Sequence, residues 1–167
     1  MKRMKNIDER AGDAAGAYAH CGPWAEGLRL WRTVPADRFG PTERAVVAEC
    51  MRRMSSTIEV WQAAIGGDAP SAIRLALRME RPLAITPASD VTMTVLLNAA
   101  LAGSAGAALV LSHMLRQMPL DAVNRRRLAT SWLAQNIRRA FSERGRGGIR
   151  RRRDRSAAGN AQGEGKP

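Results

Sequence analysis

Only four side chains in this sequence are strong ligands for soft metals: His20, Cys21, Cys50 and His113. No two of them have the spacing of a zinc finger, and two cysteines do not make a disulfide framework. The segment around Cys21 is similar to a redox-active turn, but Trp24 stands where the second thiol would be needed. We therefore expect no metal site, no cofactor and no thiol chemistry, with Cys50 a buried small hydrophobe and His113 at the surface or hydrogen-bonded.

The motifs of common enzyme classes are also missing. Gly66-Gly67 precedes a predicted helix but lacks the Lys-Ser/Thr sequel of a phosphate-binding loop. No Gly-x-Ser-x-Gly elbow is present, and the carboxylates are scattered singly, so none is paired for general acid and base roles. The sequence therefore predicts a protein that is not an enzyme.

Arginine side chains near the C-terminus are the one group with a physical argument for a partner. The formal net charge is +12, and residues 144–167 carry +6 of it. Guanidinium groups on a mobile backbone neutralise phosphates and release counterions, which drives tight binding. The segment has no aromatic residue to stack on bases, so we expect nucleic acid binding that ignores sequence. The candidate residues are Arg144, Arg146, Arg150, Arg151, Arg152, Arg153 and Arg155.

Two further arginines extend this candidate site onto a predicted helix over residues 122–142. Arg127 and Arg138 are eleven residues apart, so they project within about 20° of one another at 3.6 residues per turn. We expect them to form a basic edge that continues into the tail.

The leading hypothesis is thus a non-enzymatic accessory protein. Its arginine-rich tail holds RNA or DNA, a choice that the sequence leaves open, and its helical core contacts a protein partner. The alternative is a helical protein–protein interaction or regulatory module of the helical-repeat kind, with an incidental basic tail. A solubilising tail, a tether to an anionic membrane and an acidic protein partner are the other interpretations of the charge.

Positioning these residues depends on the uncharged stretch Val91–Ser112, which is long enough to cross a membrane. Asn98 within it is costly in hydrocarbon, and Gly103–Gly106 places weak helix formers at its centre. We therefore predict a buried hairpin, with helices over 91–102 and 107–118, rather than the single span of an inner-membrane protein. The basic N-terminus has no apolar segment behind it, which predicts no secretory signal and a cytoplasmic protein.

Composition and periodicity predict an all-α fold, because strand-forming residues are sparse. We expect a flexible segment over 1–22, a compact bundle of five to six helices over 23–143, and a disordered Arg/Gly-rich tail over 144–167. Small residues between two helix pairs in Gly66–Met118 suggest a solenoid, but no fixed period aligns.

Local signals predict the ends and faces of these helices. Thr42 is the expected N-cap of a helix that runs through Ile65 and ends at Gly66-Gly67. A short helix to about Arg81 starts at Asp68 or Ser71, and Asp121 caps the last helix. Ser89 or Asp90 is expected to cap the hairpin. Arg32 is expected in solvent. On the short helix, the inner face is expected to consist of Ile73, Ala76 and Leu77, and a basic stripe of Arg74, Arg78 and Arg81. The last helix is expected to bury Val123, Leu128, Trp132, Leu133, Ile137 and Phe141.

Overall fold

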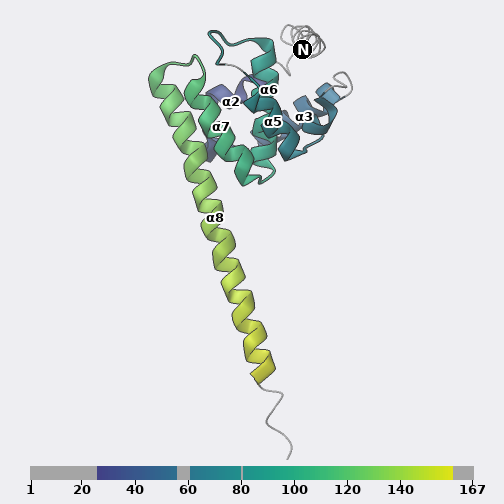
Figure 1. Ribbon diagram of the computed structural model, residues 1–167, viewed down its shortest axis with the longest axis vertical. Coiled ribbons are helices and arrows are strands. Elements are labelled where there is room, and N and C mark those ends of the chain that lie inside the picture. Colours follow the sequence, from purple (N-terminus) through teal and green to yellow (C-terminus); the bar gives the residue numbers. More distant parts are fainter. Residues whose placement is uncertain (1–25, 56–60, 80, 160–167) are drawn as a thin grey trace, which may run out of the picture.

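The structure, a computed structural model, describes residues 26–55, 61–79 and 81–159, with side chains for all of these except 55 and 142–159. The described residues contain seven α-helices and no strand, which confirms the predicted all-α class (Figure 1). Predictions for residues 1–22, for Trp24 and for residues 56–60 of the helix expected through Ile65 lie outside the described residues. The elements are η2 (Gly27–Arg29), α2 (Leu30–Thr33), η3 (Ala36–Arg38), α3 (Pro41–Ser55), α4 (Gln62–Ile65), α5 (Ala69–Leu77), α6 (Pro87–Leu101), α7 (Ala105–Gln117) and α8 (Ala122–Gly159).

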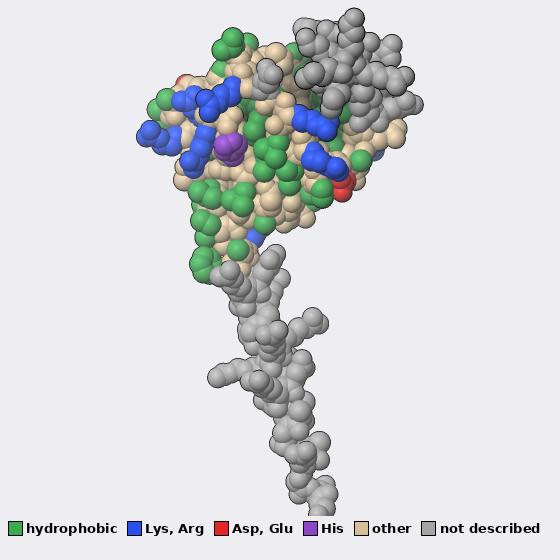
Figure 2. Space-filling view, in the orientation of Figure 1, with side chains coloured by type: hydrophobic (Ala, Val, Ile, Leu, Met, Phe, Trp, Pro, Cys, Tyr) green, Lys and Arg blue, Asp and Glu red, His purple; other side chains and the backbone are tan. Residues whose placement is uncertain are grey.

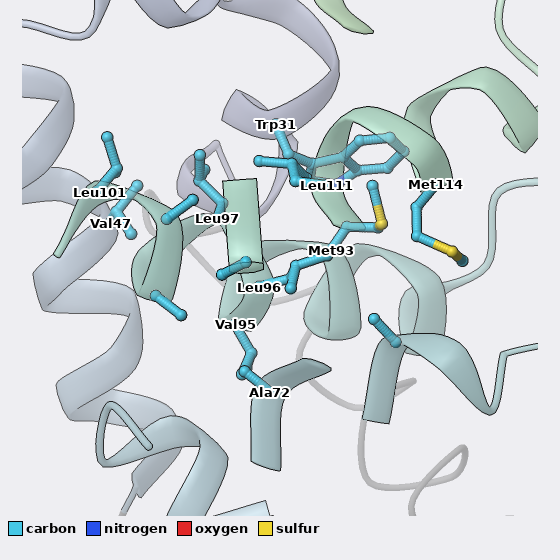
Figure 3. Close-up of a cluster of buried hydrophobic side chains, with 14 of the residues drawn as sticks. Trp31, Val47, Ala72, Met93, Val95, Leu96, Leu97, Leu101, Leu111 and Met114 are labelled. Atoms are coloured by element: carbon cyan, nitrogen blue, oxygen red, sulfur yellow. The ribbon is translucent and has the colours of Figure 1, made fainter. Parts of the chain in front are cut away.

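Helix α6 is the centre of the core. Its side chains from Met93 to Leu97 point in every direction around the helix, yet all are fully buried, as expected for a helix that is surrounded by others. Helices α3, α5 and α7 and the η2 segment all pack against it. Figure 3 shows Trp31, Val47, Ala72 and Leu111 gathered around these α6 side chains. The predicted hairpin over residues 91–118 is therefore confirmed.

Three hydroxyl groups of this hairpin have hydrogen-bond partners within the protein. Thr94 Oγ1 donates to the carbonyl of Asp90 at 2.7 Å, and Ser112 Oγ donates to the carbonyl of Ala129 on α8 at 2.8 Å. Ser104 Oγ accepts from the N–H of Ala107 and caps α7. These bonds explain how hydroxyl groups are tolerated in the interior. Among the described residues, no helix combines the length and the apolarity that crossing a membrane requires.

Two turns of the chain have the same geometry. Gly67 and Gly103 adopt φ of +98° and +108°, a conformation that favours glycine. Each follows a helix in a Schellman arrangement, in which the N–H of the next residue bonds to the carbonyl five positions earlier: Asp68 to Ala63 and Ser104 to Ala99. Asp68 and Ser104 then cap the following helix directly.

These turns belong to a repeated helical hairpin. Residues 61–79 and 97–115 align without a gap at an offset of 36, and Ala63, Ala64, Gly67, Ala69, Ala72 and Leu75 recur identically. Helix α5 packs against both α6 and α7, so the two hairpins stack side by side. The two hairpins are thus related by a single offset of 36 residues, which sequence analysis missed. Arrays of stacked hairpins form helical solenoids.

Several predicted helix ends are wrong by a few residues. Helix α3 begins at Pro41, where the carbonyl of Gly40 accepts from the N–H of Arg44, so Thr42 lies inside the first turn rather than at the cap. Helix α6 begins after Thr86, whose side chain accepts from the N–H of Ser89 in a capping box, with Pro87 in the first turn. Helix α5 ends at Leu77 rather than near Arg81. Residues 56–60, between α3 and α4, lie outside the described residues, so the single helix predicted through Ile65 is tested only in these two parts.

Some predicted faces are also wrong. Leu77 of α5 was predicted to face inward but is exposed, whereas Ala72 is buried in the core. On α8, Leu128 and Trp132 are buried as predicted, but Val123, Ile137 and Phe141 are exposed. Helix α8 packs against α7, the η3 segment and α2. The exposure of these three residues shows that they lie away from those contacts.

Helix α8 is much longer than predicted. It contains 38 residues, so at 1.5 Å per residue it is about 57 Å long, and its second half projects away from the helical body (Figure 1). The sequence predicted an end near Ser142 and disorder from residue 144. Arginine and alanine are good helix formers, and no proline occurs between residues 120 and 166 to end the helix.

Candidate nucleic-acid interface

All nine candidate arginines lie on one helix. Arg127 and Arg138 are exposed on the part of α8 that flanks the body. The other seven are in its projecting part, where the backbone is helical. At 1.5 Å per residue, Arg127 and Arg138 are separated by about 16 Å along the helix axis. Sequence analysis predicted a basic helix edge that continues into a disordered tail, whereas the structure describes both parts as one helix. The seven are Arg144, Arg146, Arg150, Arg151, Arg152, Arg153 and Arg155.

Helix α8 is held in place by its first five turns. Asp121 Oδ1 accepts from the N–H of Asn124 at 2.8 Å, which confirms the predicted cap. Trp132 is fully buried, and its ring lies 5.7 Å from that of Phe39. Ser131 Oγ accepts from the N–H of Ala36 at 3.0 Å. These contacts fix the direction in which the basic helix leaves the body.

A pocket of about 240 Å³ opens where α7 meets α8, and sequence analysis missed it. Its lining residues are Arg116 from α7 and Ala122, Arg125, Arg126 and Thr130 from α8; we call it the corner pocket. Arg125 is half-buried, and its Nη1 lies 3.5 Å from the carbonyl of Met118. The antiparallel α7–α8 hairpin brings together residues that are nine or ten positions apart in the chain, so a scan for local motifs could not find the pocket.

Few acidic residues are available to neutralise the arginines of α7 and α8. Asp121 is the one carboxylate between residues 91 and 142, and it is used as the cap of α8. Asp90 is paired with Arg32, and Glu49 is paired with Arg52 and Arg53. The hydrogen bonds from these two arginines lower the pKa of Glu49 to about 2. Figure 2 shows arginine side chains gathered beside a histidine on one side of the body.

Other arginines have structural roles. Arg139 Nη1 donates to the carbonyl of Ala100 at 2.8 Å, and Arg44 Nη1 donates to that of Leu101 at 3.2 Å. Both bonds stabilise the C-terminal end of α6, where cations are favoured by the helix dipole. Arg74 is exposed on α5 as predicted. Arg78 is exposed at the C-cap of α5 and Arg81 is exposed beyond it, so the stripe on the helix is shorter than expected.

The residues considered for other chemistry are placed as follows. Cys50 is fully buried, as predicted, and burial raises the pKa of its thiol to about 11, with the charge of Glu49 adding to the effect. His113 is exposed and shares a hydrogen bond with Gln117. Within the described part of the chain, no group of three or more His, Cys, Asp or Glu residues could hold a metal ion.

Comparison with protein-family models, with curated proteins and with solved structures found no match.

Proposed function

We propose that this chain is a non-enzymatic accessory protein that associates with nucleic acid through the arginines of α8, while its helical body contacts a protein partner. The observation that carries the proposal is the segregation of charge. Between residues 116 and 141 there are six arginines and one carboxylate, and residues 144–155 of the same helix add seven more arginines.

The physical basis is electrostatic. Each phosphate that a guanidinium group neutralises releases condensed counterions, which favours binding without reading bases. Residues 140–159 correspond to about 30 Å of helix beyond the body, and this part of the chain carries seven of the candidate arginines. No carboxylate cluster lies on the described part of this helix to compete with phosphate.

Electrophoresis of the purified protein against RNA and against duplex DNA tests the proposal. The full-length chain should retard both, and a chain that ends at residue 143 should retard them much less. Truncation there removes none of the contacts that hold α8 to the body. Retardation by neither form at physiological salt would contradict the proposal.

The repeated hairpin favours a second candidate, a helical protein–protein interaction or regulatory module with an incidental basic tail. Stacked helical hairpins present extended surfaces that bind other chains. Ile137 and Phe141, one turn apart on α8, are 47% and 67% exposed and would suit an apolar contact. Under this candidate, Ile137→Ser with Phe141→Ser would abolish partner binding, whereas loss of the tail would leave it unchanged.

A further inference from the structure

We infer that the corner pocket is a phosphate-binding site. The guanidinium groups of Arg116, Arg125 and Arg126 and the hydroxyl of Thr130 would bind the oxygens of one phosphate group. If the phosphate belongs to a polynucleotide, the inference rests on the proposed function. The pocket then adds one contact at a fixed position to the diffuse contacts of the tail.

The first argument is the gathering of like charges. Three arginines from two helices line one pocket, and no carboxylate is among its lining residues. Neither Arg116 nor Arg126 forms an ion pair with a described residue, and both are exposed. Like charges that are brought together by the fold repel one another, and a bound anion would remove that cost.

The second argument is the position of the arginines relative to the helix. Arg125 and Arg126 follow directly after the first turn of α8, near the end of the helix dipole that carries positive charge. Cations are normally favoured at the opposite end. Two arginines here are therefore better suited to hold an anion than to stabilise α8.

The third argument is the geometry of the donors. Arg125 is half-buried, and its contact with the Met118 carbonyl restricts its position. Arg116 and Arg126 are the two exposed arginines of the pocket, and we call them its rim. Guanidinium groups bind two oxygens of a phosphate at once, and a hydroxyl adds a further donor. The volume of about 240 Å³ is smaller than the roughly 300–1,000 Å³ of sites that enclose a whole drug-sized ligand. The pocket thus suits one phosphate group.

The test compares two full-length variants with equal loss of charge. Arg116→Gln with Arg126→Gln changes the rim of the pocket and spares the anchored Arg125. Arg78→Gln with Arg81→Gln removes two exposed arginines that lie away from the pocket. Binding to duplex DNA is measured against salt for both. We expect the pocket variant to lose about 0.9 from the log–log slope, the contribution of one phosphate, with a smaller change in the control.

A second measurement uses inorganic phosphate alone. In the wild type, the side-chain N–H signals of Arg116 and Arg126 should shift on titration with phosphate but not with chloride at equal ionic strength. Arg125 and Thr130 signals should shift in the wild type and remain unmoved in the pocket variant.

The outcomes separate the two proposals. Equal losses in both variants, with no response to phosphate, would overturn the pocket while leaving the proposed function intact. A response to phosphate in a protein that binds no polynucleotide would support the pocket, assign it to a small phosphate compound, and contradict the proposed function. Absence of both responses would overturn both.

Discussion

The carboxylate of Asp90 and the guanidinium of Arg32 form an ion pair of 2.9 Å that joins α6 to α2 across 58 positions of sequence. The same carboxylate accepts from the indole N–H of Trp31, also at 2.9 Å. The side chains of Arg32 and Asp90 are 23% and 14% exposed, so the pair is largely removed from water. It secures the N-terminal helical segment to the central helix.

Replacing Asp90 with Asn should destabilise the protein. The carboxylate offers two acceptor oxygens to two donors, whereas the amide offers one oxygen and turns an N–H₂ group toward the other donor. A buried donor left without an acceptor costs about 1–3 kcal/mol, which chemical denaturation would measure. Asp37→Asn, at an exposed carboxylate in η3, is the control and should leave the free energy of unfolding unchanged. Equal stability of the two variants would contradict this role.

The charge on Asp90 should not itself stabilise the fold. Burial raises the pKa of Asp90 above its ordinary value of 3.8, although the charge of Arg32 and the hydrogen bond from Trp31 oppose the rise. The native state then binds more protons than the unfolded state at pH values between 3.8 and the raised pKa. Stability due to this group therefore falls as pH rises through that window.

The direction of this pH dependence can be measured as the difference in free energy of unfolding between the wild type and Asp90→Asn. As pH is lowered toward 3.8, the free energy of unfolding of the wild type should increase relative to that of the variant. A relative decrease would mean that the attraction of Arg32 outweighs the cost of burial.

Gly27 should tolerate no larger side chain while Cys50 is present. A Cβ added at Gly27 would overlap Cys50 Sγ and approach Val46 Cγ1 to 3.0 Å. Overpacking of this kind costs about 1–3 kcal/mol, so Gly27→Ala should lower the free energy of unfolding by that amount. The double variant with Cys50→Ala should cost less than the sum of the single variants, because the overlapping sulfur is gone. Strict additivity would show that the close approach is relieved elsewhere.

Asp121→Ala should cost about 1 kcal/mol through loss of the N-cap of α8. Asp121→Asn keeps an oxygen for the N–H of Asn124 and should melt like the wild type. If the alanine variant also melted like the wild type, the start of α8 would be fixed by its packing against α7 instead.

Sequence predicted best what depends on neighbouring residues. Gly67, Gly103 and Asp121 end or begin helices as expected, since a positive φ or a capping carboxylate is a local requirement. Thr86 was missed because its capping box uses Ser89 where the usual pattern has Glu or Gln.

Sequence failed where distant segments meet. Arg32 was expected in solvent and Asp90 at a cap, and only the packing of α2 on α6 shows that they pair. No linear motif predicts the corner pocket, because its lining residues come from two helices. Ile137 and Phe141 matched an inward apolar arc, but no described helix covers that side of α8.

The salt dependence of binding to duplex DNA tests the central claim most directly. Four to six effective contacts between α8 and phosphates imply a log–log slope of about −4 to −5, at roughly 0.9 per phosphate. Deletion of residues 144–167 should flatten that slope and weaken binding by orders of magnitude, with the melting temperature of the helical body nearly unchanged. Replacing Arg150–Arg153 with Lys should keep most of the affinity, because a diffuse contact needs charge more than fork geometry. If the full-length chain bound no polynucleotide at physiological salt, or bound it with no dependence on salt, association through the arginines of α8 would be contradicted.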